Sequence, residues 1–483
     1  MYNSIQHFAE NGIPEIEKII LNFSKNQKDM SEFITGIKEV VISLGLSIIK
    51  ETFESYDELL RQSGKRKQKW SIVKSDTKNL ITSLGNVQYN KTLFINKETH
   101  ERSYLLDKIL GIESHERMTE EAEALLLEEA AETNYAKAGK LFSISEEVSK
   151  QSVHNKIKEL KFPEEKIETE KKRVKYLYID ADEAHIALQY KESKGDLKEK
   201  SRKEKNNCQI SKLVYVYEGI EKEGKRTRLK NVHYFSGTYG GQKGNKELWE
   251  EVKRYIEKTY EKDEIEKIYF NSDGGQWMKR GREELGTEYV LDEFHLIKYL
   301  KKLTRHKKET QEETINELKE WIKEGKKKEL ERWLEKEKEG TEDESLKEKL
   351  ETKMKYIIEN LSGAKVRLRK EEGVIGSSTE SHVSHVLASR MSSRPMGWCK
   401  ENIDKMSRLR AYKKNGGSML DLVRFQKTEM EEKVSEEVYG MRELLKSEKS
   451  KHKNIGKYFD SMQCSVSTQT SMKIAFNEKI WSL

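Results

Sequence analysis

The chain has 483 residues, of which 37% are charged and 35% hydrophobic, and 92 Lys and Arg against 85 Asp and Glu give a net charge of +7. This length allows two to four domains, and the composition is typical of a soluble, helix-rich protein. The three cysteines are far apart without CxxC spacing, so neither a disulfide framework nor a structural zinc site is indicated. No apolar run approaches the roughly 18 residues of a membrane span, and the N-terminus lacks a signal-peptide pattern, so we expect a cytoplasmic protein without a membrane partner.

Residues 1–62 carry apolar side chains at helical spacing, among them Ile34, Ile37 and Val41. Such a period predicts helices with one apolar face. We therefore expect a helical N-terminal arm that serves in assembly.

Residues 63–163 combine a hairpin signal with short helices. Gly85 and Asn86 stand between two alternating runs, which predicts a β-hairpin. Helical patterns follow over residues 120–131, 135–142 and 145–160. The last of them offers side chains that can reach base edges and phosphates, namely Lys150, Gln151 and Asn155. This pattern suits a DNA-binding region with a helix-turn-helix-like unit, and a helical linker with a polar face suits it as well.

A charge run over residues 164–173 marks a linker, after which the pattern changes to strands. Over residues 174–295 the chain gives three strands, a helix, a strand, a helix and a strand. This order predicts an α/β core of ribonuclease-H-like type, with a mixed five-stranded sheet and helices. Residues 296–372 read as a helical insertion, residues 373–446 as the last helices of the core, and residues 447–483 as a C-terminal tail.

Acidic residues stand at three places of this predicted core. Asp180 and Asp182 share one face of the first strand, because side chains alternate along a strand. Asp273 follows the fourth strand and precedes two glycines, and Glu380 opens a late helix. Carboxylates are the oxygen ligands that hold Mg²⁺ for two-metal phosphoryl transfer, and Mn²⁺ is an alternative ion.

Six stretches together resemble the signature blocks of the ISLre-two family of bacterial insertion-sequence transposases. They are Ala181-Asp-Glu-Ala-His185, Asn271-Ser-Asp-Gly-Gly-Gln-Trp277, Leu291-Asp-Glu-Phe-His-Leu-Ile-Lys298, Thr379-Glu-Ser-His-Val-Ser-His-Val386, Arg390-Met-Ser-Ser-Arg-Pro-Met-Gly-Trp398 and Leu409-Arg-Ala-Tyr-Lys-Lys-Asn-Gly416. The resemblance covers residues from about 70 to about 420, and these Asp/Asp/Glu transposases are similar to the Mutator-like group.

The resemblance implies catalytic and metal-binding roles for Asp182, Asp273 and Glu380. Asp180 is the alternative first acid, and the family's Asp-x-x-His element falls on Asp292 and His295 in a supporting role. A purely structural hydrogen bond is an equal explanation of that element.

Several other side chains have two interpretations. Four arginines are candidate phosphate clamps or plain surface charge, namely Arg390, Arg394, Arg408 and Arg410. Trp277 and Trp398 would stack on an unpaired base or, the better explanation, pack in the core. His382 and His385 suit structural or phosphate-facing roles better than a zinc site with His295.

These patterns lead to one predicted function. We expect a DNA transposase that binds the terminal inverted repeats of an insertion sequence as a homo-oligomer on double-stranded DNA. It would cleave the element ends with divalent metal and transfer them to target DNA. The alternatives are a nuclease with the same core and no strand transfer, and an inactive, transposase-derived DNA-binding protein.

Overall fold

The computed structural model of the chain describes residues 3–164, 170–189, 208–224, 226–376, 378–394 and 396–427. These residues divide into two compact units. The first contains residues 3–126, 139–148 and Lys427, and the second contains residues 127–138 and 149–426. The predicted DNA-binding region, residues 63–163, is therefore shared between the two units, and the predicted tail, residues 447–483, lies outside the described residues. Within the described ranges, no helix is both long enough and apolar enough to cross a membrane.

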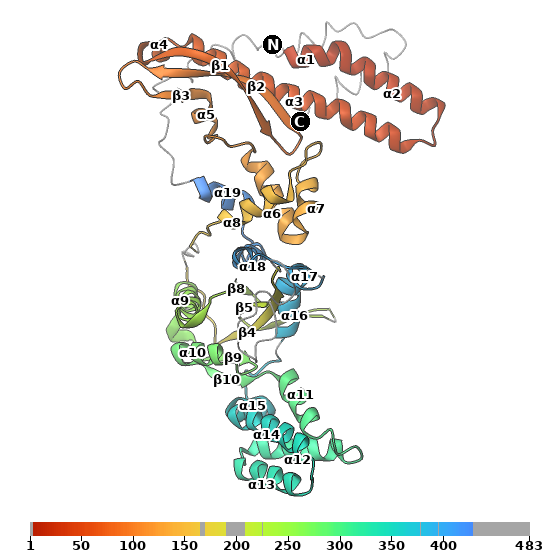
Figure 1. The fold of residues 1–483 in the computed structure, drawn as a ribbon, viewed down its shortest axis with the longest axis vertical. Helices are drawn as coiled ribbons and strands as arrows, with labels where there is room; N and C mark the ends of the chain where they lie inside the picture. The colour runs from red at the N-terminus through yellow and green to blue at the C-terminus, as the bar shows by residue number, and fades with distance from the viewer. Residues whose placement is uncertain are drawn as a thin grey trace. The chain divides into compact units, whose positions relative to one another are not determined.

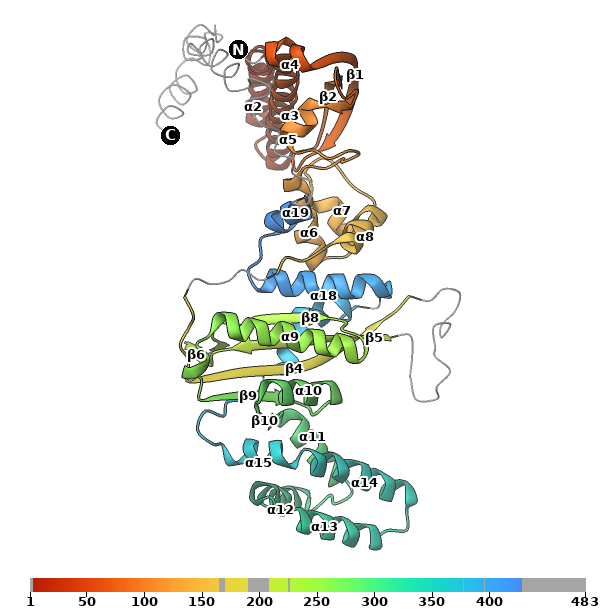
Figure 2. The same ribbon diagram turned by 90° about the vertical axis from the view of Figure 1, so that its left-hand side faces the viewer.

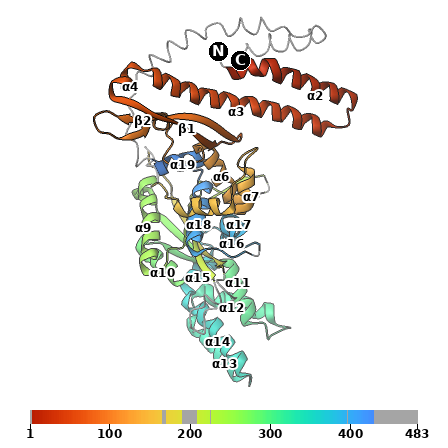
Figure 3. The ribbon, with the colours of Figure 1, turned by 45° about the horizontal axis from the view of Figure 1, so that its top comes forward.

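The first unit begins with the helices predicted for residues 1–62 (Figure 3). Its elements are α1 (Asn3–His7), the π-helix η1 (Phe8–Gly12), α2 (Ile13–Lys25), α3 (Met30–Gln62), α4 (Gly64–Lys69), β1 (Trp70–Ile81), β2 (Asn86–Asn96), β3 (Arg102–Tyr104) and α5 (Leu105–Leu110). Asp29 caps α3 by accepting a hydrogen bond from the Glu32 N–H, and Phe23 of α2 stacks on Phe33 of α3 at 4.6 Å.

The predicted hairpin is confirmed as β1 and β2, which pair antiparallel from Trp70–Asn96 to Ile81–Asn86. Gly85 ends the turn with φ +152°, and a Cβ there would stand 2.1 Å from the Ser145 hydroxyl oxygen, so a side chain does not fit. Asp57 of α3 fixes the helix to β2, because its buried carboxylate accepts the Thr92 N–H at 3.0 Å and the Thr92 hydroxyl at 2.5 Å.

The second unit is built on a mixed five-stranded sheet, which confirms the predicted strands (Figure 1). Its strands are β4 (Tyr176–Ala187), β5 (Cys208–Tyr217), β8 (His233–Gly237), β9 (Lys267–Ser272) and β10 (Glu288–Leu291), in the spatial order β10-β9-β4-β5-β8. The first three pair antiparallel, whereas β9 lies parallel to both β4 and β10. The two-stranded ribbon β6 (Ile220–Glu223) and β7 (Arg226–Leu229) was not predicted, because its short charged sequence shows no apolar alternation.

One face of the sheet forms the apolar core of the second unit. Leu177, Ile179 and Ala181 of β4 pack there beneath α9 (Gly241–Thr259) and α10 (Gln276–Leu285). Trp249 of α9 is fully buried against α10, and a Cβ on Gly281 would stand 2.3 Å from its ring. A glycine at this position therefore lets the two helices approach closely.

The predicted helical insertion has a core of its own beside β10 (Figure 2). It contains α11 (Glu293–Leu303), α12 (Gln311–Glu324), α13 (Lys327–Glu339), α14 (Glu344–Glu359) and α15 (Leu361–Arg369). Apolar side chains from all five helices, such as Leu300, Leu318 and Ile357, are fully buried together. The insertion is thus a packed helical subdomain that begins two residues after β10.

The remaining helices come from residues 120–159 and 379–427. They are α6 (Glu120–Glu132), α7 (Tyr135–Leu141), α8 (Lys150–Glu159), α16 (Thr379–Val383), the π-helix η3 (Ser384–Ala388), α17 (Ser389–Met391), α18 (Lys400–Lys414) and α19 (Met419–Lys427). In Figure 1, α16 and α17 lie on the side of the sheet opposite to α9. Ser407 of α18 bonds to Ser211 of β5 at 2.7 Å, which fixes α18 on the sheet.

We predict that Gly281→Ala destabilises the protein by about 1–3 kcal/mol, because the added methyl group overpacks the Trp249 ring. Urea unfolding followed by circular dichroism measures the effect. The control is Gly240→Ala at the N-cap of α9, where nothing lies within 4 Å of the added Cβ, and we expect a loss of only a few tenths of a kcal/mol. Equal losses in both variants would contradict the packing argument.

Candidate active site

The two acids of β4 lie on the face of the sheet opposite to the apolar core. Asp180 stands across from Tyr215 of β5, and Asp182 stands across from Leu213. Ala181, the residue between them, points into the apolar core. The two acids therefore share a face, as predicted from the strand period. Asp180 is fully buried, whereas Asp182 is partly exposed.

Asp180 is fully buried and is held by hydrogen bonds from two neighbouring strands and from the start of α16. Its carboxylate accepts the Tyr215 hydroxyl at 2.8 Å, the Tyr217 hydroxyl at 3.1 Å and the Asn271 amide at 2.6 Å. The Thr379 hydroxyl, from the start of α16, donates to it at 3.5 Å. A buried carboxylate needs such donors, because burial without them is costly. The Asp180 carboxylate therefore has a structural role as a buried acceptor of internal hydrogen bonds.

Asp182 instead lines a cavity of about 230 Å³. The cavity is lined by Ala181, Asp182, Asp273, Asp292, Phe294, His295, Ser378, Thr379, Glu380 and Ser381. All three acids implied by the resemblance are in this set, together with the Asp-x-x-His pair, and Asp180 is not. The geometry therefore favours Asp182 over Asp180 as the first acid of the site.

Asp273 reaches the cavity from the turn after β9. Its carboxylate accepts the Gly275 N–H at 3.0 Å, and its backbone carbonyl accepts the Tyr356 hydroxyl of α14 at 2.6 Å. Gly274 has φ +91°, and a Cβ there would stand 2.2 Å from the Asn360 side chain. The first glycine of the motif therefore has a structural reason: its backbone is left-handed and the helical subdomain approaches it closely.

Glu380 stands in the first turn of α16, with its side chain exposed. Thr379 beside it is buried and bonded to Asp180, so the position of the helix start depends on the network under the sheet. A carboxylate in the first turn also interacts favourably with the helix dipole. The late-helix acid is thereby brought to the cavity that holds Asp182 and Asp273.

The electrostatics of the cavity show an accumulation of negative charge. The pKa of Asp182 is raised to about 7, chiefly by burial and also by the charges of Asp273 and Glu380, against the lowering effects of the Glu183 N–H and His295. The hydrogen bond to Asp292 raises the pKa of His295, and the charges of Asp273 and Asp182 add to this shift. His295 is the single basic side chain among the cavity residues that the structure describes.

Asp292 and His295 form the hydrogen-bonded pair that the Asp-x-x-His element suggested. Asp292 is the N-cap of α11 and accepts the His295 N–H at 3.1 Å, and the His295 Nδ1 lies 2.9 Å from the same carboxylate oxygen. The pair fixes the first turn of α11 at the cavity. A structural role is therefore evident, and it also orients the imidazole toward the acids.

The donor set suits a hard divalent cation, although the acids do not converge here. Among the described residues, no three His, Cys, Asp or Glu side chains stand together as a metal-ligand group. Asp182, Asp273 and Glu380 nevertheless share one cavity, and carboxylate oxygens are the ligands that Mg²⁺ prefers. A cation between them would also relieve the repulsion that raises the pKa of Asp182. The residues therefore fit such an ion by donor type and charge.

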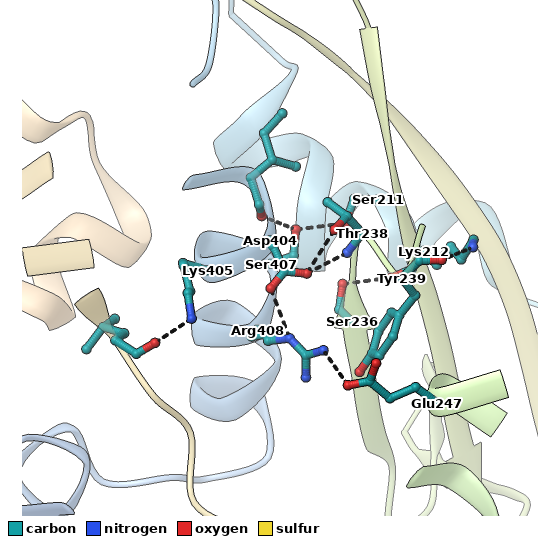
Figure 4. Close-up of polar contacts among 12 residues, drawn as sticks. Ser211, Lys212, Ser236, Thr238, Tyr239, Glu247, Asp404, Lys405, Ser407 and Arg408 are labelled. Carbon is teal, nitrogen blue, oxygen red and sulfur yellow. Dashed lines mark hydrogen bonds and ion pairs between the residues drawn. The ribbon is translucent and has the colours of Figure 1, made fainter. Parts of the chain in front are cut away.

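Three of the four predicted arginine clamps are engaged within the protein. Arg410 is buried and donates to the His385 carbonyl at 2.7 Å. Arg390 is buried, donates to the Ala130 carbonyl at 3.0 Å and lies over the Trp398 ring at 4.7 Å. Arg408 pairs with Asp404 at 3.1 Å and approaches Glu247 at 4.0 Å (Figure 4). Their guanidinium groups are therefore occupied by protein acceptors. Arg394 is exposed, as are Lys150, Gln151 and Asn155 of α8.

The other side chains with two interpretations have structural contacts. Trp277 donates from its indole N–H to Glu183 at 2.9 Å and stacks on Trp249, and Trp398 is buried. His382 stacks on Tyr215 at 4.5 Å and lies 2.8 Å from the Tyr234 hydroxyl. Burial lowers the pKa of His382 to about 4. Core packing is thus the observed role of Trp277, Trp398 and His382.

Sequence reasoning missed three residues of the site. Arg367 of α15 is buried and donates to the Asn271 side chain at 2.7 Å and to the Leu291 carbonyl at 3.0 Å, so it links the helical subdomain to β9 and β10. Nothing distinguishes this arginine within the charge-rich insertion. Asn271 and Phe294 lie inside the stretches 271–277 and 291–298 that contain Asp273 and Asp292. Their closeness in sequence to these acids was the signal that could have identified them.

Comparison with known proteins gives one family. The model described as "Uncharacterised protein family (UPF0236)" matches residues 23–433. Two UPF0236 proteins of Caldanaerobacter subterraneus subsp. tengcongensis are 34% and 35% identical over 416 residues, which cover 86% of this chain and 84% and 85% of those proteins. The name of the first joins eleven designations. A protein of Streptococcus gallolyticus named "UPF0236 protein in vanSb 3'region" is 25% identical over 84% of this chain and 86% of its own length.

The raised pKa of Asp182 predicts a pH-dependent cost to stability. A carboxyl whose pKa is higher in the folded state stabilises that state at low pH, and this stabilisation is lost as pH rises from the unfolded pKa near 4 to the folded pKa of about 7. Asp182→Asn removes the charge. Without divalent metal, we expect the variant to have a larger unfolding free energy than wild type. This difference should increase by about 2 kcal/mol between pH 5 and pH 8.

Urea unfolding in the presence of a chelator measures this difference. The control is Asp421→Asn on α19, whose side chain is exposed and whose variant should differ from wild type equally at both pH values. A pH-independent effect of Asp182→Asn would show that this carboxyl carries no raised pKa.

Proposed function

The chain belongs to the uncharacterised protein family UPF0236, and we propose that it is a DNA transposase which cuts and joins DNA strands with divalent metal ions. One observation carries the proposal. Asp182 in the middle of β4, Asp273 just after β9 and Glu380 in the first turn of α16 are far apart in the sequence and line one cavity. Carboxylates are the kind of ligand that holds the metal ions in two-metal phosphoryl transfer.

The sheet supports the same proposal. Its order β8-β5-β4-β9-β10, with an antiparallel meander followed by two parallel strands, is the order we expect of a ribonuclease-H-like core. The helical subdomain α11–α15 enters between β10 and α16, where the resemblance to the transposases implies a helical insertion. Fold alone does not establish activity, so the weight of the proposal rests on the acids.

The residues have distinct roles in this proposal. Asp182, Asp273 and Glu380 would hold the metal ions, which when bound supply the activation of the attacking oxygen and the stabilisation of the leaving one. The Gly275 N–H orients the Asp273 carboxylate, and the bond from Thr379 to Asp180 fixes the start of the Glu380 helix. Asp292 keeps His295 close to the acids, where a protonated imidazole offsets part of their charge.

The relatives add circumstantial support. One relative has a name that joins eleven designations in one organism, as we expect of a gene present in many copies, such as that of a mobile element. The DNA partner would be the inverted repeats of such an element and its target. The exposed apolar side chains of the N-terminal arm, Leu21, Ile34 and Val41, are suited to self-association on that DNA.

The proposal is tested by incubating the protein with Mg²⁺ or Mn²⁺ and duplex DNA that carries the flanks of its own gene. We expect strand cleavage and joined products. Asp182→Asn, Asp273→Asn and Glu380→Gln should each lower the cleavage rate at least about a thousandfold, because each removes a ligand that acts in the transition state. Sequencing gels measure both products.

The outcomes separate the alternatives. Asp421→Asn, exposed on α19, should retain wild-type cleavage and controls for loss of an acidic charge. Cleavage without joined products would favour a nuclease. Sequence-specific binding of the flanking DNA without cleavage, under either metal, would favour a DNA-binding protein and contradict the catalytic proposal.

We expect α8 to contribute a phosphate contact through Lys150. Lys150→Ala should weaken DNA binding and reduce the slope of log affinity against log salt by about one. The matched control is Lys158→Ala on the same helix, because the Lys158 ammonium is already paired with Glu401 at 2.7 Å. Fluorescence anisotropy over a salt series measures both slopes, and an equal slope change in the two variants would count against a specific role of Lys150.

A further inference from the structure

An exposed phenylalanine borders the carboxylate cavity. Phe294 lines the same cavity as Asp182, Asp273 and Glu380, and 57% of its surface is exposed. Exposure of a phenyl group to water forgoes the favourable free energy of burial. A single exposed apolar side chain is ordinary on a protein surface, so the informative feature is the position of this ring at a cavity with four acids.

Helix geometry keeps this ring out of the core. The buried side of α11 carries Leu296, Leu300 and Leu303, which pack in the helical subdomain. Phe294 precedes Leu296 by two positions, which places it on the far side of the helix, and Lys298 follows on that same side one turn later. The N-cap bonds of Asp292 hold this first turn in place. The ring is thus presented at the cavity by a fixed helix end.

The neighbours of the ring are cationic or titratable. The Lys298 ammonium lies 5.2 Å from the centroid of the Phe294 ring, and the His295 ring meets it edge-on at 5.5 Å. Trp277 and Trp398, the two tryptophans of the six sequence stretches, are engaged in packing and internal hydrogen bonds. Phe294 is therefore the aromatic side chain with an accessible ring among the described residues that line the cavity.

We propose that Phe294 stacks on an unpaired nucleobase of the DNA strand whose phosphate lies at Asp182, Asp273 and Glu380. Every base has a π-face, so an aromatic ring binds an unstacked base with little regard to sequence. Lys298 stands where it would meet the backbone of the same strand. This subsite rests on the proposed DNA-cleaving function and adds to it the form of the substrate: a strand with an unstacked base beside the reacting phosphate.

The probe is a forked duplex whose short unpaired arm carries 2-aminopurine, compared with the blunt duplex of the same sequence. Wild type should bind the fork more tightly and quench 2-aminopurine emission. Phe294→Ala should lose the quench and about tenfold of the preference for the fork, whereas Phe294→Trp should keep both, because stacking needs an aromatic face. Anisotropy and steady-state emission are measured in Ca²⁺.

Two variants make the test specific. Phe425→Ala removes another exposed phenylalanine that does not line the cavity, and it should behave as wild type. Phe294→Leu keeps an apolar side chain without a π-face and should behave as Phe294→Ala. The subsite is overturned if Phe294→Ala keeps the quench and the fork preference, if Phe294→Leu matches Phe294→Trp, or if wild type shows no fork preference.

These outcomes are distinct from failure of the proposed function. The function would be retained and the subsite refuted if wild type cleaves DNA with metal, Phe294→Ala cleaves equally well, and wild type itself shows neither the quench nor the fork preference. Quench and fork preference in a protein that never cleaves would retain the subsite as a DNA-binding feature and refute the catalytic proposal.

Discussion

The buried carboxylate of Asp180 is the constraint on which the site depends. A charge under a sheet is tolerated only when donors surround it, and here they come from β5, β9 and the start of α16. Each donor belongs to a segment that must stand in one place for the bond to form. The network therefore sets the register of β4 against its neighbours and seats the helix that carries Glu380. Asp182 lies two residues beyond Asp180 on β4, and Asp273 lies two residues beyond Asn271, the partner of Asp180 on β9. The bonds of Asp180 therefore help to position both acids.

The helical subdomain is connected to the same network rather than attached at the edge alone. Arg367 joins α15 to Asn271, which itself donates to Asp180. Tyr356 of α14 donates to the backbone of Asp273, and the close approach of Asn360 requires the glycine at position 274. Movement of this subdomain would thus act directly on the turn that holds Asp273. The helical subdomain and the acids are therefore connected by direct contacts, although they are separate segments in the sequence.

The sequence predicted the strands, the hairpin and the helical insertion, because alternation and helical spacing are local properties. It could not separate Asp180 from Asp182, since a period of two places both on one face and only tertiary packing decides which is buried. The same limit explains Arg390, which looked like a phosphate clamp and is enclosed by Trp398 and the Ala130 carbonyl. Arg367 carried no signal at all, because its role arises from contacts with β9 and β10 that are distant in sequence. The charged ribbon β6–β7 lacked the apolar pattern by which strands are detected.

The buried positive charges of the second unit lie away from the carboxylate cavity. The buried arginines Arg367, Arg390 and Arg410 donate to backbone carbonyls, and none of them lines the cavity. The cavity holds four acids against one histidine, and burial with mutual repulsion raises the pKa of Asp182 to about 7. A protein that needed only stability would lose nothing by exchanging Asp182 for a neutral residue, since a neutral group avoids both costs. The arrangement is therefore suited to a ligand that brings the missing positive charge, and among biological ligands a divalent cation matches oxygen donors of this kind.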